Sequence, residues 1–308
     1  MNKSIVLMFH EIHDEKWFDD TLNHLSRKYR FVSATDLNEV VLGTRISNGI
    51  CHITFDDGHV SFYNKAYPIL KKHGFPATLF ISPEKIIRRE NYWFQRVRSF
   101  SKAEFHHYVC SQIQDKFDVE LGKYGVYSIL KSMPISVINN FIEGFRNIKN
   151  LPEEEFINID VDQLLEIADS GLIEIGAHTM NHPILANEDD STARFEITKS
   201  ISDLQSLIKR DVRYFAYPNG QPVLDFGARE ENFLKESGIR LAFSTSSDQL
   251  KPAYSLFALP RIGISKGSIG YVNRKIRFAK HWIGLRNLMH RTTEDKERKI
   301  LSQNRRNL

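Results

Sequence analysis

The sequence predicts an α/β fold in which parallel strands are joined by helices. Short apolar runs alternate with helical patterns along most of the 308 residues, and this alternation is typical of parallel strands with crossover helices. The strands are continuous apolar runs, which indicates that both of their faces are buried. Without residues 88–152, which break the alternation, the chain has about the length of a single α/β barrel.

Each predicted element follows from its local pattern. Apolar runs predict strands at 4–9, 50–55, 77–81, 172–177, 212–217, 240–245 and 257–264. Amphipathic patterns predict helices at 15–29, 62–73, 161–170, 191–208 and 229–237. Gly74, Gly171 and Gly238 follow three of these helices as end signals, and Pro260 places the last strand at an edge or a strand end. Residues 88–152, called the insertion below, have a helical, aromatic-rich pattern.

Composition excludes several classes of protein. Hydrophobic residues make up 41% of the chain, the mean hydropathy is −0.37, and no apolar run reaches the roughly 18–20 residues of a membrane span. Two cysteines, Cys51 and Cys110, exclude a disulfide-dense scaffold. The N-terminal residues resemble a first strand rather than a targeting segment. We therefore expect a globular cytoplasmic protein.

Charge is distributed unevenly along the chain. The net charge is +4, but residues 271–308 contain 11 Lys and Arg against 3 Asp and Glu. We therefore divide the chain into a body (1–270, including the insertion) and a basic tail (271–308). Residues 276–291 mix bulky apolar and basic side chains, as interfacial helices do. They predict peripheral contact with the inner membrane face, and a solvated terminus is the alternative; nucleic acid is not an expected partner.

Two carboxylates follow the predicted strand 50–55. Asp56 and Asp57 precede Gly58 at the carboxyl end of that strand, where parallel α/β folds place their active sites. A polar turn is the alternative interpretation, because Asp-Asp-Gly also opens ordinary loops.

Two further strand ends have polar turns. His178 and His182 directly follow the strand 172–177, and their spacing lets both imidazoles reach one metal ion. With one carboxylate they would form a metal site that keeps positions open for water and substrate. The turn Tyr217-Pro218-Asn219-Gly220 follows the strand 212–217 and can direct a main-chain N–H at a developing oxyanion.

Taken together, the ordered motifs TFDDG, HTMNH and FAYPNG resemble those of the polysaccharide deacetylases, the NodB-homology or carbohydrate esterase 4 family. LMFHEI and ALPRIGI resemble a branch that includes the biofilm poly-N-acetylglucosamine deacetylases. The resemblance covers roughly 4–87 and 153–265. It implies a distorted (β/α)7 barrel, with the insertion and the basic tail as additions to it.

The resemblance also implies roles for individual residues. Asp56 would be the general base, and Asp57, His178 and His182 would bind a divalent metal ion, usually Zn²⁺, with Co²⁺, Ni²⁺, Fe²⁺ or Mn²⁺ as other candidates. Thr179 would support the site. The ion would polarise an acetamido carbonyl and activate a water molecule, and Asp56 would accept a proton from that water.

The sequence departs from the family pattern in three places. Ala216 stands where many members have an Arg that holds the catalytic Asp, and Arg261 is the candidate substitute; pairing with a surface carboxylate is the alternative. The late His that supplies the general acid is missing, and His10 at the end of the first strand matches its place in the resembled branch; a capping role, or a position remote from the metal, is the alternative. His59 stands where an aromatic residue is common, which would alter substrate contacts.

These observations predict a metal-dependent N-deacetylase. Its substrate would be an N-acetylated amino sugar of a cell-surface glycan or of a lipid- or nucleotide-linked precursor. One alternative is a catalytically weak carbohydrate-binding protein on the same scaffold. Another is a deformylase or other amidohydrolase with the same metal site. Aromatic residues 92–94 would either stack on sugar rings or form the core of the inserted subdomain.

Overall fold

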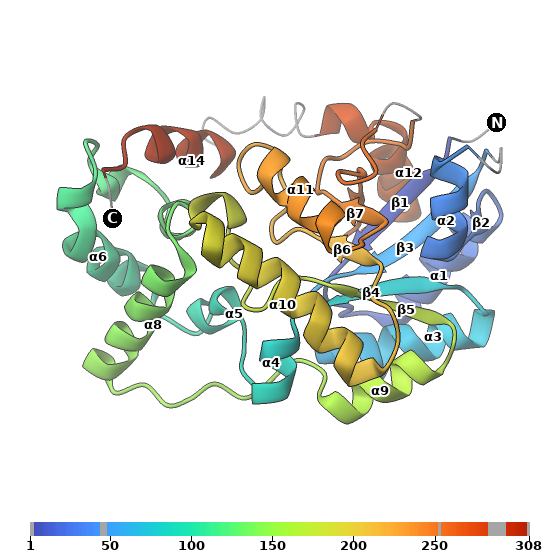
Figure 1. The fold of residues 1–308 in the computed structure, drawn as a ribbon, viewed down its shortest axis with the longest axis horizontal. Coiled ribbons are helices and arrows are strands. Elements are labelled where there is room, and N and C mark those ends of the chain that lie inside the picture. Colours follow the sequence, from blue (N-terminus) through green and yellow to red (C-terminus); the bar gives the residue numbers. More distant parts are fainter. Residues whose placement is uncertain (1–2, 44–47, 252–253, 283–293, 307–308) are drawn as a thin grey trace.

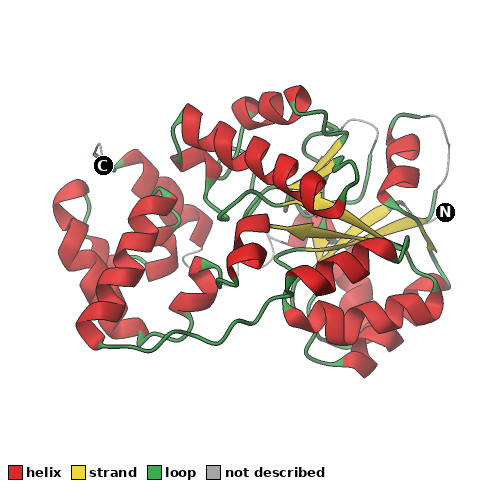
Figure 2. Cartoon of the chain, turned by 60° about the horizontal axis from the view of Figure 1, so that its bottom comes forward, coloured by secondary structure: helices red, strands yellow, loops and turns green. Residues whose placement is uncertain are grey.

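The computed structural model describes residues 3–43, 48–251, 254–282 and 294–306. Its centre is one curled parallel sheet flanked by helices (Figure 1, Figure 2). The strands are β1 (Ile5–Phe9), β2 (Arg30–Phe31), β3 (Ile50–Phe55), β4 (Ala77–Ile81), β5 (Ile173–Ala177), β6 (Tyr214–Ala216), β7 (Leu241–Phe243) and β8 (Ile262–Gly263). Their order is β7-β6-β5-β4-β3-β1-β8, with β2 paired to β3, and every pair is parallel. The predicted α/β fold is confirmed.

Helices connect and cover the strands. The barrel helices are α1 (Glu15–Ser26), α2 (Ala34–Val41), α3 (Tyr67–His73), α4 (Pro83–Arg88), α9 (Val161–Asp169), α10 (Asp190–Ile208), α11 (Ala228–Glu236) and α12 (Ile269–Arg277). A π-helical turn at Phe62–Ala66 precedes α3. Among the described residues, no helix combines the length and the apolar character needed to cross a membrane.

Parallel register aligns the strand ends that matter for function. Phe9 at the end of β1 pairs with Phe55 at the end of β3, and Ile81 at the end of β4 pairs with Ala177 at the end of β5. Residues that follow these strands therefore meet at one edge of the sheet. The segment before β8 contacts β7 through a bridge between Phe243 and Leu259, which brings the two ends of the sheet together.

The observed elements differ from the predicted ones at several points. Helix α4 was not predicted, and the predicted strands 212–217 and 240–245 are reduced to Tyr214–Ala216 and Leu241–Phe243. The first helix ends at Ser26 rather than at residue 29, and β2 and α2 follow it where no element was predicted. The last strand is reduced to Ile262–Gly263, because Pro260 has no N–H to donate to a neighbouring strand.

The insertion has its own hydrophobic core. It contains α5 (Trp93–Val97), α6 (Lys102–Ile113), α7 (Val126–Leu130) and α8 (Ile135–Lys149), with short 3₁₀ turns at Gln114–Lys116 and Leu121–Lys123. These helices lie to one side of the barrel (Figure 1). Their apolar faces pack on one another, and hydrogen bonds between the side chains of Gln95 and Asn158 connect the start of the insertion to the chain that follows it (2.8 and 2.9 Å).

Both described helices of the tail pack on the rest of the protein. Val272 and Ile276 of α12 are buried in the barrel core. Leu301 of α14 (Glu294–Gln303) is buried in the core of the insertion. The interfacial helix predicted at 276–291 falls partly on residues 283–293, which lie outside the described residues.

Candidate metal centre and active-site pocket

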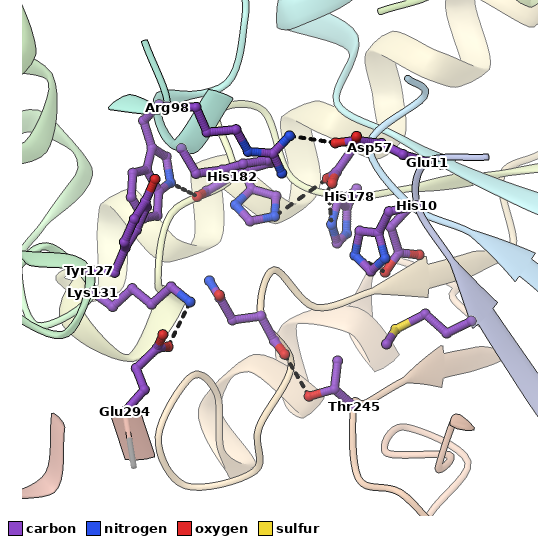
Figure 3. Close-up of a pocket in the computed structure, with 15 residues that line it drawn as sticks. His10, Glu11, Asp57, Arg98, Tyr127, Lys131, His178, His182, Thr245 and Glu294 are labelled. Carbon is purple, nitrogen blue, oxygen red and sulfur yellow. Dashed lines mark hydrogen bonds and ion pairs between the residues drawn. The ribbon is translucent and has the colours of Figure 1, made fainter. Parts of the chain in front are cut away.

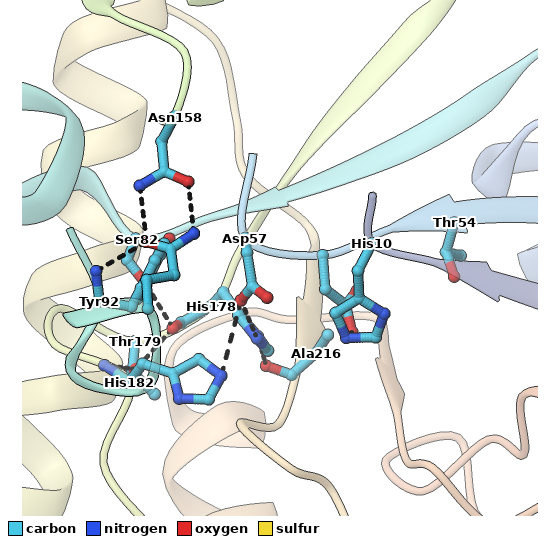
Figure 4. A network of polar contacts seen from close by, with 12 residues as sticks. His10, Thr54, Asp57, Ser82, Tyr92, Asn158, His178, Thr179, His182 and Ala216 are labelled. Atoms are coloured by element: carbon cyan, nitrogen blue, oxygen red, sulfur yellow. Dashed lines mark hydrogen bonds and ion pairs between the residues drawn. The ribbon is translucent and has the colours of Figure 1, made fainter. Parts of the chain in front are cut away.

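Asp57, His178 and His182 form a buried group that can hold a metal ion (Figure 4). Asp57 Oδ1 lies 3.5 Å from His178 Nε2 and 3.6 Å from His182 Nε2. The three ligand atoms lie within 4.8 Å of one another, a geometry that no other such group has in the described part of the chain. One carboxylate and two imidazoles leave coordination positions free for water and substrate.

The surroundings of these atoms fit a divalent cation. Asp57 Oδ1 is buried and has no hydrogen-bond partner among the described residues, which is unfavourable unless a cation compensates its charge. His178 Nδ1 lies 2.6 Å from the carbonyl oxygen of Ala216 and donates to it. The lone pair of His178 therefore lies on Nε2, which faces Asp57.

The loops that carry the candidate ligands have unusual backbone conformations. Asp57, Thr179 and His182 have φ values of 69°, 62° and 61°, in the left-handed region. Thr179 Oγ1 accepts from the His182 N–H (3.0 Å) and donates to the His178 carbonyl (2.5 Å). Thr179 thus stabilises the loop between the two imidazoles.

A buried carboxylate that sequence reasoning missed also supports this loop. Glu196 Oε2 accepts the main-chain N–H groups of Met180 and Asn181, each at 2.9 Å. Its signal was present in the sequence, since Glu196 lies on the apolar face of the predicted helix 191–208, between Ala193 and Ser200. A carboxylate at such a position needs buried donors.

Asp56 is held by Arg261. The guanidinium makes two hydrogen bonds to the carboxylate, 2.7 Å to Oδ1 and 2.9 Å to Oδ2. Arg261 is fully buried and also donates to the Ser244 carbonyl (3.0 Å). The sequence also allowed Arg261 to pair with a surface carboxylate. In the structure it pairs with the buried Asp56 instead. Burial alone would raise the pKa of Asp56, but Arg261, His178 and His10 outweigh it and hold that pKa below its usual value.

His10 lies beside Asp56 at the mouth of the site. Its Nε2 is 3.9 Å from Asp56 Oδ2, and its side chain is 48% exposed. Because it follows β1 directly, the register of β1 with β3 places it next to the Asp pair. His10 is therefore open to solvent on one side, and on the other it shares a pocket with Asp57, His178 and His182, called the metal group below.

A pocket of about 460 Å³ lies above these residues (Figure 3), a volume within the range of small-molecule sites. His10, Asp56, Asp57, His178 and His182 lie on its barrel side. Trp93, Phe94, Arg98, Tyr127 and Lys131 from the insertion and Glu294 from α14 line the opposite side. The sequence left open where the insertion lies relative to the site; the structure places it on the pocket.

Only part of the predicted substrate turn reaches the pocket. Asn219 lines it, and the side-chain Nδ2 of Asn219 is buried without a partner among the described residues. Tyr217 points into the core, where it stacks on Phe226 and donates to the Phe257 carbonyl (2.9 Å). Pro218 is buried.

The contacts of Gly220 and His59, two other predicted site residues, hold the local chain in place. Gly220 has φ +69°, and a Cβ there would lie 2.9 Å from the Tyr217 carbonyl oxygen, so only glycine fits this turn. His59 is not among the residues that line the pocket. Its Nδ1 lies 2.8 Å from Ser61 Oγ, and burial lowers the pKa of its ring.

Three consecutive aromatic residues of the insertion surround His182. The Trp93 indole N–H donates to the His182 carbonyl (3.2 Å). The rings of Tyr92 and Phe94 lie 5.5 and 4.9 Å from the His182 ring, centroid to centroid. Burial lowers the pKa of His182 to about 3, which keeps its imidazole neutral, as a metal ligand requires. Trp93 and Phe94 thus belong to the insertion core and to the surroundings of the metal group at once.

We predict that Arg261→Met lowers the free energy of unfolding by about 3–5 kcal/mol, because Asp56 would be buried without its partner. The double variant Asp56→Asn/Arg261→Met should regain part of this loss in denaturant titrations. Arg213→Met removes an exposed pair with Asp211 and should change stability by less than about 1 kcal/mol. Losses that simply add in the double variant would contradict the coupling.

Replacing Trp93 by Phe should weaken metal binding about 10-fold, because His182 loses a contact that fixes its position. Competition with a chromogenic chelator measures this affinity directly. Trp17→Phe is the matched control, since the Trp17 indole donates to the Gly267 carbonyl (2.7 Å) and does not line the pocket. An affinity of the Trp93→Phe variant within twofold of the wild type would contradict the positioning role.

Known structures resemble this fold over most of its length. The Streptococcus pyogenes deacetylase PplD in complex with acetate is 18% identical, with a TM-score of 0.60 over 89% of this chain and 98% of that chain. IcaB from Ammonifex degensii is 18% identical, with a TM-score of 0.62 over 91% and 98%. The BpsB deacetylase domain from Bordetella bronchiseptica is 15% identical, with a TM-score of 0.55 over 85% and 96%. At these identities the likeness shows the fold.

Sequence comparison identifies the family. Curated protein sequences contain no significant match. The sequence profile described as polysaccharide deacetylase, however, matches residues 46–241. This range covers well over half of the chain and includes Asp56, Asp57, His178 and His182. The chain belongs to the polysaccharide deacetylase family.

Proposed function

We propose that this chain is a metal-dependent N-deacetylase that hydrolyses the acetamido group of N-acetylated amino sugars. The substrate would be a cell-surface polysaccharide or its lipid- or nucleotide-linked precursor. One observation supports this most directly. Asp56, paired with Arg261, lies beside a buried group of Asp57, His178 and His182 at the base of a pocket.

The donor set favours zinc, because two imidazoles and one carboxylate are frequent Zn²⁺ ligands. Co²⁺, Ni²⁺, Fe²⁺ and Mn²⁺ accept the same donors. A divalent ion held there supplies Lewis acidity toward the acetamido carbonyl and lowers the pKa of a water molecule.

Asp56 and His10 each carry out one of the proton transfers. Arg261 keeps Asp56 ionised, so that its carboxylate can accept a proton from the attacking water. His10, beside Asp56 at the mouth of the site, donates a proton to the leaving amine. A main-chain N–H near Asn219, which lines the pocket, would stabilise the negative charge that develops on the carbonyl oxygen.

Acetate release from N-acetylglucosamine oligomers tests this function. Asp56→Asn should lower kcat by about 100- to 10,000-fold, as expected for loss of a general base, and a chelator should abolish the activity. Asp115→Asn, at an exposed side chain of the insertion, is the control and should leave kcat unchanged.

The same assay separates the alternatives. Equally slow acetate release by wild type and Asp56→Asn with every metal would favour a carbohydrate-binding protein. Release of formate from N-formylated sugars, without release of acetate, would identify a deformylase.

We also propose that the protein contacts the inner membrane face, where a lipid-linked precursor would be presented. Arg274, Arg277, Phe278 and Lys280, in and just after α12, are exposed. Cations flanking an exposed aromatic ring are suited to anionic headgroups. Since Val272 and Ile276 of the same helix are core residues, the contact would use its polar face.

The triple variant Arg274→Glu/Arg277→Glu/Lys280→Glu should bind vesicles containing phosphatidylglycerol about 100-fold more weakly than the wild type, at about 1 kcal/mol per basic residue. Sedimentation of protein with vesicles measures this. Lys71→Glu/Lys102→Glu/Lys123→Glu changes the charge equally at other exposed positions. If both triple variants bind the vesicles equally weakly, binding depends only on the net charge of the protein, and the assignment of the contact to α12 is wrong.

A further inference from the structure

The insertion and α14 form one wall of the active-site pocket, opposite the barrel. Arg98, Tyr127 and Lys131 line this wall from the insertion, and Glu294 lines it from α14. Figure 3 shows these side chains facing the metal group across the pocket. The metal group itself is deep, since Asp57, His178 and His182 are 5%, 1% and 6% exposed. A substrate must therefore enter between two walls.

A first ion pair joins the two walls next to the proposed general acid. Arg98 Nη1 of the insertion donates to Glu11 Oε1 of the barrel (2.5 Å). Glu11 follows His10 directly, so this pair, called the first bridge, crosses the pocket rim beside the reacting groups (Figure 3).

A second connection lies where α14 meets the insertion. Lys131 Nζ donates to Glu294 Oε1 (2.7 Å). Glu297, one turn further along α14, accepts from Ser128 Oγ (2.5 Å) and from the Gly125 N–H (3.0 Å). These bonds fix α14 to α7, and the pair Lys131–Glu294 is called the second bridge.

The other face of α14 is fixed to the barrel. Arg298 donates to Asp225 Oδ1 (2.5 Å), and both side chains are buried. The Gln221 side chain donates to Asp295 (2.7 Å). Gln221 and Asp225 belong to the loop that follows the Asn219 turn. Helix α14 therefore connects the insertion to the barrel. Because Arg298 and Asp225 are buried, this connection does not depend only on exposed ion pairs.

We infer that the site acts on an N-acetylated sugar at the end of a chain or on a short carrier, and not on units within a long polysaccharide. This inference rests on the proposed function. An internal unit needs a groove that is open on both sides of the reacting sugar. Here the insertion is joined to the barrel at two separated positions of the rim, directly through Arg98 and Glu11 and indirectly through α14. The pocket volume of about 460 Å³ suits a small number of sugar units.

Product mapping on hexamers of N-acetylglucosamine, linked β-1,4 and β-1,6, tests the inference with the zinc-loaded full chain. Mass spectrometry of fragmented products should locate the first free amine at a terminal unit only. The kcat/KM for the dimer should lie within about threefold of that for the hexamer. First deacetylation at internal units, or a hexamer preferred more than tenfold over the dimer, would overturn the inference.

Removing the bridges provides a second measurement. Arg98→Ala/Lys131→Ala should allow deacetylation at the penultimate unit, because Arg98 no longer crosses the rim to Glu11 and Lys131 no longer fills its part of the pocket wall. Arg88→Ala/Lys123→Ala is the control, since it removes exposed intrahelical or local pairs outside the pocket. An unchanged product pattern in the first variant, confirmed as folded by its melting temperature, would overturn the role of the bridges.

The same measurements distinguish a failure of the proposed function from a failure of this inference. If the proposed function is wrong, neither the wild type nor the variant releases acetate from any oligomer, and the inference is then wrong as well. Internal products with normal acetate release would overturn the inference and leave the proposed function intact.

Discussion

The buried pair between Arg261 and Asp56 determines how the site is built. A charged guanidinium with no exposed surface is tolerated only when carboxylate and carbonyl oxygens surround it. Arg261 meets this need by contacting Asp56 after β3 and the Ser244 carbonyl after β7. It thereby connects two strands that are far apart in the sheet order. The position of the carboxylate, its ionisation and the closure of the barrel all depend on this contact.

The metal group depends in turn on parts of the chain that are distant in sequence. The turn from His178 to His182 is held from the barrel side by Glu196. The insertion holds it from the other side through Trp93. A ligand loop supported by two subdomains has little freedom to reorient, which favours a preorganised site. The insertion is thus part of the site as well as a separate hydrophobic core.

The sequence predicted those features that follow from local pattern. Apolar runs located the strands, and parallel register explains why Asp56 and His178, each following a strand, lie together. The two-residue β2 and the helix after it have too few residues for a periodic signal. The wall of the pocket could not be predicted, because Lys131 and Glu294 are 163 residues apart and no local pattern encodes such a pairing. Arg261 was predicted only from its place in the motif ALPRIGI. The spacing of residues does not indicate that its side chain is buried or that it makes two hydrogen bonds to Asp56.

The left-handed backbone at two of the candidate metal ligands restricts how these positions can vary during evolution. Apart from glycine, the residues that adopt this conformation most readily are Asn, Asp and His, and the structure has Asp57 and His182 there. Glycine would relieve the backbone but has no ligand atom, whereas Glu or Cys would supply an atom and strain the loop. Conformation and coordination chemistry therefore select the same few amino acids. Sequence drift at these two positions is limited even where the metal-binding requirement alone would permit other side chains.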